Sequence, residues 1–173
     1  MLKTINKTLY ETGDIARFTL RFFRELFKPR LEFSELLRQC YYVGYMSVAL
    51  VAITAFIMGL VITIQSRPTL VEFGAQAWLP KMVSVSLIRE IAPVITALIC
   101  AGKIGSGIGA ELGSMKVTEQ IDAMEVSGTN PFKYLVVTRV LATTLMIPLL
   151  AIFADGIALY GGYLGANLQA VVS

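Results

Sequence analysis

The stretch VGYMSVALVAITAFIMGLVITI, residues 43–64, decides the fold class of this chain. It is long enough to cross a bilayer as an α-helix, because a rise of ~1.5 Å per residue carries about 20 residues through ~30 Å of hydrocarbon. No charged residue lies between Arg38 and Arg67. We therefore predict a first membrane span at residues 43–64.

The rest of the chain has the same character. Of its 173 residues, 55% are hydrophobic and only 16% are charged, which fits a membrane protein better than a soluble domain. Two further apolar runs predict spans at residues 82–113 and 136–162, and the loop between the first two spans contains Pro68 and Pro80 as helix breakers. The sequence thus predicts an all-α, polytopic membrane protein with a single membrane domain over residues 1–173.

A basic amphipathic segment precedes the first span. In DIARFTLRFFRELFK, residues 14–28, the cations recur at intervals of three and four, and aromatic and aliphatic side chains occupy the other faces. This pattern is typical of a helix that lies in the membrane interface, and a soluble helix packed on a partner is the alternative. Pro29 predicts its end. The cations of the stripe are Arg17, Arg21, Arg24 and Lys28.

The distribution of cations predicts the orientation of the chain. Eight of the fifteen Lys and Arg residues precede residue 40, whereas the loop at residues 66–80 carries only Arg67. By the positive-inside rule, the N-terminus is expected in the cytoplasm. The loop at residues 66–80 then faces the opposite side, and the segment at residues 115–127 returns to the cytoplasm.

Charged residues interrupt apolar stretches of the second and third spans, notably Arg89 and Glu90 in the second and Asp155 in the third. A charge near the bilayer centre costs roughly 3 kcal/mol, so such residues usually face a protein interior or a cavity and have a partner. Arg89 and Glu90 point about 100° apart on a helix and must find separate partners. Arg89 and Asp155 are expected at similar depth, which predicts an ion pair between them. Alternatively, Arg89 and Glu90 reach the membrane surface or a protein interface.

Small residues mark one face of the second span. Gly105, Gly109 and Gly113 recur every four positions, a spacing that lets helices approach closely in lipid. We predict a helix-packing face there, with a flexible glycine-rich loop as the alternative.

A short polar segment, MKVTEQIDAMEVS at residues 115–127, separates the second and third spans. Its period predicts an amphipathic helix with Glu119, Asp122 and Glu125 on the wet side, ended by the Ser, Gly, Asn and Pro residues that follow. A rigid rod between two spans can transmit the motion of a docked subunit to both of them.

The residue types for catalysis or metal binding are scarce. The chain has no histidine, and Cys40 and Cys100 are expected to be structural. The tripeptide ending at Lys103 resembles the end of a phosphate-binding loop, but Ala97 and Ile104 replace its required Gly and Ser or Thr. We expect no catalytic residue, no metal and no cofactor bound directly by the chain.

Residues 87–126, LIREIAPVITALICAGKIGSGIGAELGSMKVTEQIDAMEV, resemble the MlaE/YrbE permease family. The family pattern runs L-R-E-hydrophobic-G/A-P-V, then A-G-[KR]-x-G-S, then A-E-x-G-x-M-x-x-x-E-Q-hydrophobic-x-x-M-E. So many fixed positions over about forty residues form a specific signal. The matching residues are Arg89, Glu90, Pro93, Val94, Ala101, Gly102, Lys103, Gly105, Ser106, Ala110, Glu111, Gly113, Met115, Glu119, Gln120, Met124 and Glu125.

The resemblance implies the membrane subunit of an ATP-binding-cassette (ABC) system that moves phospholipids or related lipids between the bacterial inner membrane and an envelope carrier, as in maintenance of outer-membrane lipid asymmetry. The implied partners are a second permease copy, cytoplasmic ATPase subunits that use the ATP, a periplasmic lipid-binding protein with Mce domains, and membrane lipids, with no nucleic acid. Arg89 and Glu90 are expected near the lipid cavity. The implied coupling helix for the ATPase contains Glu119, Gln120, Asp122, Met124 and Glu125.

The chain departs from the family pattern at its end. Family members run on for roughly two further spans beyond the position of Ser173, so the C-terminal spans of the family are expected to be absent. Two other functions stay open: a membrane scaffold that recruits an ATPase without transport, and an ion-coupled secondary transporter that titrates Asp155 or Glu90.

Overall fold

The computed structural model describes residues 2–28 and 32–172, with side chains described for residues 7, 10–28 and 32–168. Throughout this part of the chain the regular structure is helical. Three helical segments are long and apolar enough to cross a membrane: Phe33–Glu72, Gln76–Val117 and Phe132–Leu168. The prediction of an all-α, polytopic membrane protein is confirmed.

The elements follow one another with short connections. The predicted spans at 43–64, 82–113 and 136–162 lie inside longer helical segments, and their membrane boundaries stay predictions. In chain order the elements are α1 (Leu2–Leu26), α2 (Phe33–Glu72), the 3₁₀ turn η1 (Gln76–Trp78), α3 (Leu79–Ser86), the π-helical turn η2 (Leu87–Ile91), α4 (Ala92–Val117), α5 (Gln120–Val126), the π-helical turn η3 (Phe132–Val137) and α6 (Thr138–Val172).

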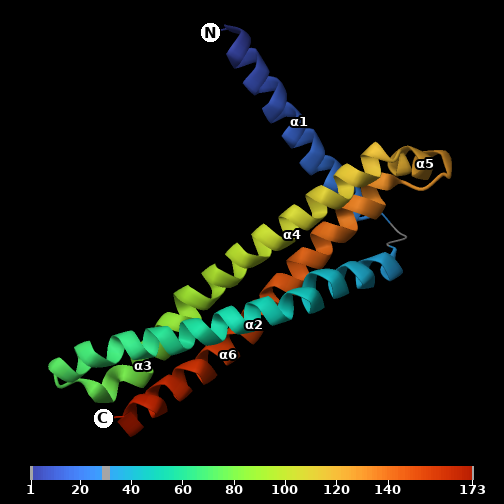
Figure 1. Cartoon of the computed structure of the whole chain (residues 1–173). Helices are drawn as coiled ribbons and strands as arrows, with labels where there is room; N and C mark the ends of the chain where they lie inside the picture. The colour runs from blue at the N-terminus through green and yellow to red at the C-terminus, as the bar shows by residue number, and fades with distance from the viewer. Residues whose placement is uncertain (1, 29–31, 173) are drawn as a thin grey trace.

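The long helices α2, α4 and α6 form one elongated bundle (Figure 1). At one end, here called the α5 end, lie α5, the start of α2 and the last turns of α1. At the other, the α3 end, α2 turns back into α3 close to the C-terminal part of α6. The chain therefore crosses the length of the bundle three times.

Helix α1 extends away from the bundle and touches it only near its own C-terminal end (Figure 1). It begins at Leu2, twelve positions before the predicted residue 14, and its described helix ends at Leu26. The Phe18 ring meets the Phe132 ring edge-on at 5.1 Å between centroids, and Arg21 lies 4.5 Å above the same ring. The predicted stop at Pro29 lies outside the described residues. The interfacial position of the segment at 14–28 stays a prediction.

The loop between the first two spans is shorter than predicted. Pro68 does not break α2, which continues to Glu72. The helix ends instead in a glycine cap: Gly74 has φ +64° and donates its N–H to the Val71 carbonyl, while Ala75 donates to Leu70. This pattern satisfies the last helical carbonyls and needs a residue that tolerates positive φ. Glycine, not proline, therefore ends the helix.

Helices α2 and α6 pack along a seam of small side chains. Every fourth residue of α2 is buried, from Glu35 to Thr63. A Cβ atom on Gly59 would collide with the Ala158 carbonyl, and one on Gly161 with the Phe56 carbonyl. Rows at four-residue spacing let two backbones interdigitate closely, and in lipid this packing replaces the hydrophobic effect as the main attraction.

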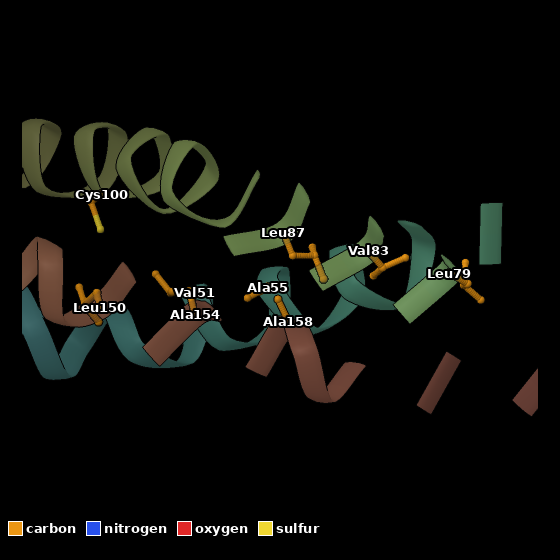
Figure 2. Packing of buried hydrophobic residues seen from close by; sticks show 9 residues of the cluster. All are labelled: Val51, Ala55, Leu79, Val83, Leu87, Cys100, Leu150, Ala154 and Ala158. Atoms are coloured by element: carbon orange, nitrogen blue, oxygen red, sulfur yellow. The ribbon is translucent and has the colours of Figure 1, made fainter. Parts of the chain in front are cut away.

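The apolar core lies along this seam and is closed by α3, η2 and α4 (Figure 2). Leu87 and Cys100 are completely buried, which agrees with a structural role for the cysteine. Figure 2 shows Val83 of α3 and Leu87 of η2 on the side that faces Ala55 of α2 and Ala158 of α6. The cluster consists of Val51, Ala55, Leu79, Val83, Leu87, Cys100, Leu150, Ala154 and Ala158.

Candidate functional site

The charged residues of the second span lie in the π-helical turn η2. The Ala92 N–H donates to the Leu87 carbonyl five residues back. Pro93 has no N–H to donate to the Arg89 carbonyl, so a wider turn is accommodated here. Leu87 takes the buried face, and Arg89 and Glu90 are both exposed. The chain thus presents two opposite charges on the outside of an otherwise apolar span.

The predicted ion pair between Arg89 and Asp155 is wrong for the single chain. In the part of the chain that the structure describes, no ion pair joins these two residues. Leu87 points toward α2 and α6, and Arg89, two positions later, lies on nearly the opposite face of the helix. Asp155 has one buried carboxylate oxygen, Oδ1, without a hydrogen-bond partner among the described residues.

The segment at residues 115–127 forms the end of α4, a turn and then α5. Glu119 makes the turn with φ 56° and ψ 17°, a left-handed conformation that is unusual for a residue with a Cβ atom. At the other end Gly128 has φ +76°, and Gly128 and Thr129 donate their N–H groups to Glu125 and Met124. Both ends of this short helix are therefore fixed by specific backbone geometry.

Helix α5 presents an exposed, mixed surface. Lys116 at the end of α4 lies 3.0 Å from Asp122, Nζ to Oδ1, and joins the two helices. Val117, the last residue of α4, and Val126, the last residue of α5, are 85% and 90% exposed. Among the predicted coupling residues, Met124 is partly buried and the other four, Glu119, Gln120, Asp122 and Glu125, are exposed.

The glycine row of α4 packs against no other helix among the described residues. Gly105, Gly109 and Gly113 are exposed, and a Cβ atom built on any of them would meet nothing within 4 Å among the described residues. The close packing that the sequence shows here occurs instead between α2 and α6. The predicted packing role of these glycines stays a prediction about a second chain.

An ion pair that the sequence did not predict, between buried Arg139 and partly exposed Glu111, joins α4 to α6. Arg139 is 3% exposed, and its Nη2 lies 2.8 Å from Glu111 Oε2. Its Nη1 also donates to the Leu135 carbonyl at 3.2 Å. A signal was present, because Glu111 and Arg139 are opposite charges that fall within the predicted second and third spans, on either side of the short polar segment.

A second polar network joins α2 to the start of the last helical segment. Glu35 is buried, accepts a hydrogen bond from Gln39 Nε2 at 2.8 Å and another from the Tyr134 hydroxyl at 3.0 Å. Arg38 Nη1 lies 3.5 Å from its second oxygen. Every carboxylate oxygen of this buried acid is therefore paired.

A third network connects the last turn of α1 to η3. Glu25 accepts hydrogen bonds from Lys28 and from Asn130 Nδ2, and Lys133 Nζ donates to the Lys28 carbonyl at 3.0 Å. The hydrogen bond from Lys28 lowers the pKa of Glu25 below its usual range, with further attraction from Lys133 and Arg21 opposing the cost of burial. The α5 end of the bundle is thus held by charges, whereas the α3 end is held by apolar contacts.

The described part of the chain contains no group of side chains suited to binding a metal ion. Among the residues that the structure describes, no three His, Cys, Asp or Glu side chains come together in a way that could hold a metal ion. What the arrangement offers is exposed charge inside an apolar span, and a rigid exposed helix at one end of the bundle.

Comparison with known proteins gives one consistent answer. The sequence matches the family described as Permease MlaE over residues 36–173. It is 39% identical over 158 residues to the probable ABC transporter permease protein RT0041 of Rickettsia typhi, covering 91% of this chain and 61% of that protein. It is 40% identical over 153 residues to the probable ABC transporter permease protein slr1045 of Synechocystis, covering 87% and 57%.

A third relative carries a more specific name. The chain is 34% identical over 139 residues to the intermembrane phospholipid transport system permease protein MlaE of Haemophilus influenzae, covering 79% of this chain and 53% of that protein. The chain spans about three fifths of the length of the first relatives that it matches.

Proposed function

The chain belongs to the MlaE permease family, and on that premise we propose that it is the membrane subunit of an ABC transporter that moves phospholipids or related lipids between a bacterial inner membrane and an envelope carrier. The phospholipid transport named for the Haemophilus influenzae relative supports the lipid substrate. A separate partner subunit hydrolyses the ATP, and the chain binds no cofactor itself.

The observation that carries the proposal is the geometry of α5. This helix is exposed and lies directly between two helices long enough to span a membrane. Lys116 and Asp122 tie it to α4, and Glu111 and Arg139 tie α4 to α6. A force applied to α5 therefore reaches both helices together, which is what a coupling helix beneath an ATPase requires.

The orientation follows from the cations of α1. With the N-terminus in the cytoplasm, the α5 end of the bundle faces the cytoplasmic ATPase subunits. The α3 end then faces the periplasm, where a lipid-binding protein with Mce domains would receive or deliver the lipid.

Arg89 and Glu90 are the proposed contacts in the lipid pathway. Both are exposed on a π-helical turn, and such turns occur frequently at functional sites. An exposed guanidinium in an apolar span suits a lipid phosphate, and the neighbouring carboxylate suits a partner helix or an amine. Asp155 is a third intramembrane charge, on a different helix.

A second copy of the chain is the proposed partner within the membrane. The Gly105, Gly109 and Gly113 face of α4 is exposed and free of side chains that would keep a neighbouring helix away. A homodimer that buries this face would enclose the lipid pathway between two permeases.

The experiment is ATP-driven transfer of a fluorescent phospholipid by the full-length protein reconstituted with its ATPase partner. The proposal expects transfer that stops when ATP is withdrawn. Transfer that continues without ATP and follows an ion gradient would favour an ion-coupled transporter. ATPase binding without any lipid transfer would favour the scaffold.

A further inference from the structure

A polar cavity of about 300 Å³ lies between α2 and α4 at the α5 end of the bundle. Arg38, Gln39 and Tyr42 line it from α2, and Gly107 and Glu111 line it from α4. A smaller space of about 30 Å³ shares four of these residues and extends deeper between the same helices. Neither Arg89 nor Glu90 lies here, so the cavity is separate from the proposed lipid pathway.

The deeper space contains an unpaired hydroxyl group. Ser47 is completely buried and lines this space, and its Oγ has no hydrogen-bond partner among the described residues. Buried hydroxyl groups are nearly always hydrogen-bonded, so a ligand or a water is expected to complete this one. Lys103, which also lines the space, donates to the Met46 carbonyl beside Ser47.

The charges around the cavity favour an anion. Both nearby carboxylates are already paired, Glu111 with Arg139 and Glu35 with Gln39 and Tyr134. The Arg38 side chain is 73% exposed and makes only a 3.5 Å contact with Glu35, so most of its donors are available. A guanidinium group matches the geometry of a phosphate, and the amide of Gln39 and the hydroxyl of Tyr42 supply further donors.

The depth of the cavity points to a lipid. Tyr41, Tyr42 and Tyr45 are exposed side chains on this part of α2. Exposed tyrosines gather where a membrane protein passes through the headgroup region. The larger cavity therefore lies at the level of lipid phosphates, in the leaflet at the α5 end.

We infer that the α2/α4 cavity binds the phosphate group of a phospholipid headgroup through Arg38, Gln39 and Tyr42. The proposed function supplies the context, a permease that handles phospholipids, and this site would hold one in the leaflet opposite the α3 end. Gly107 leaves the space for the headgroup, because a Cβ atom there would meet nothing within 4 Å.

Photochemical labelling tests the site. The photoreactive residue p-benzoylphenylalanine replaces Tyr42 in the full-length protein, in membranes of cells grown with radiolabelled phosphate. The same substitution at Tyr45, one turn away and outside the cavity, is the matched control. We expect at least about tenfold more labelled phospholipid at position 42 than at position 45. Arg38→Gln and Gly107→Leu should each abolish this difference, whereas Gly102→Leu and Lys81→Gln should preserve it.

Equal labelling at positions 42 and 45, or labelling that Arg38→Gln and Gly107→Leu leave unchanged, would overturn the inference. Gly107→Leu fills open space, so its effect does not depend on unfolding. Phosphorus NMR of the delipidated protein with inorganic phosphate distinguishes a lipid phosphate from free phosphate as the ligand. If free phosphate binds and also blocks the labelling, the site belongs to a soluble anion instead. Labelling requires no ATP, so loss of ATP-driven transfer with labelling intact would contradict the proposed function alone.

Discussion

Buried Arg139 forms an ion pair with Glu111, in which Nη2 lies 2.8 Å from Oε2. The pair joins α6 to α4 close to the point where α5 connects them. Lys116 and Asp122 make a second, exposed link between α4 and α5. These two pairs make α4, α5 and the first turns of α6 one mechanical unit, and that unit is where the proposed ATPase partner would act.

Removing the carboxylate that pairs with buried Arg139 should destabilise the protein. We expect Glu111→Gln to lower the free energy of unfolding by roughly 1–3 kcal/mol, less than for a fully buried pair because the Glu111 side chain is 44% exposed. Unfolding of the reconstituted protein in denaturing detergent measures this. Lys116→Gln, which breaks an exposed pair, is the control and should cost less than about 1 kcal/mol. An equal loss in both variants would contradict a special role for Arg139.

The glycine seam between α2 and α6 should tolerate no side chain. Gly59→Val would push a branched side chain against the Ala158 carbonyl, so we expect a loss of about 1–3 kcal/mol or more in the same unfolding assay. Gly102→Ala is the control, because it adds a methyl group in open space and should raise helix stability by roughly 0.5–1 kcal/mol. A Gly59→Val protein as stable as Gly102→Ala would rule out this seam.

Glu119 offers a way to separate the shape of α5 from its charge. Its left-handed backbone suits glycine, so Glu119→Gly should keep or raise stability by up to about 1 kcal/mol, and Glu119→Val should lower it. If the Glu119 carboxylate contacts the ATPase, Glu119→Gly should still weaken ATPase binding about tenfold, the value of one charge-assisted hydrogen bond. A pull-down titration with the ATPase subunit measures this, and unchanged binding would remove Glu119 from the contact.

The link between α1 and η3 should be sensitive to acid. The pKa of Glu25 is lowered in the folded protein, so its contribution is fully present above the ordinary glutamate pKa of about 4.3 and is lost as the pH falls through the lower folded value. We expect hydrogen exchange around Asn130 and Lys133 to accelerate as the pH drops below about 4, after correction for the intrinsic exchange rate. In Glu25→Gln this step should be absent, and a step that persists there would assign it to another group.

The sequence was sufficient for features that depend on composition and local period. Long uncharged runs predict spans because the bilayer requires them. The helical period of residues 115–127 predicts one short helix, but only residues 120–126 form α5, whereas residues 115–117 end α4. The family motif likewise contains residues that are exposed on α5 and η2.

The sequence was insufficient for features that depend on which helices contact each other in the folded chain. A row of glycines shows that a helix can be approached closely but not by which neighbour. Within the part of the chain that the structure describes, the row at Gly105, Gly109 and Gly113 contacts no neighbouring helix, whereas Gly59 and Gly161 do. Arg89 and Asp155 were predicted to pair because they are expected at a similar depth in the membrane. Leu87 occupies the buried face of the helix, however, so Arg89, two positions later, lies on nearly the opposite face. Arg139 was overlooked because its partner, Glu111, belongs to another helix.

The central claim is that this protein moves lipid when an ATPase acts on α5, with Arg89 in the lipid pathway. The most direct measurement compares ATP-driven phospholipid transfer with ATPase binding in reconstituted Arg89→Ala protein. The account predicts that transfer falls at least about tenfold, the value of one charge-assisted hydrogen bond to a phosphate, while ATPase binding is unchanged, because Arg89 is exposed and the 26-residue helix α4 separates it from α5. Transfer at the unsubstituted rate, or no ATP-dependent transfer by the unsubstituted protein, would contradict it.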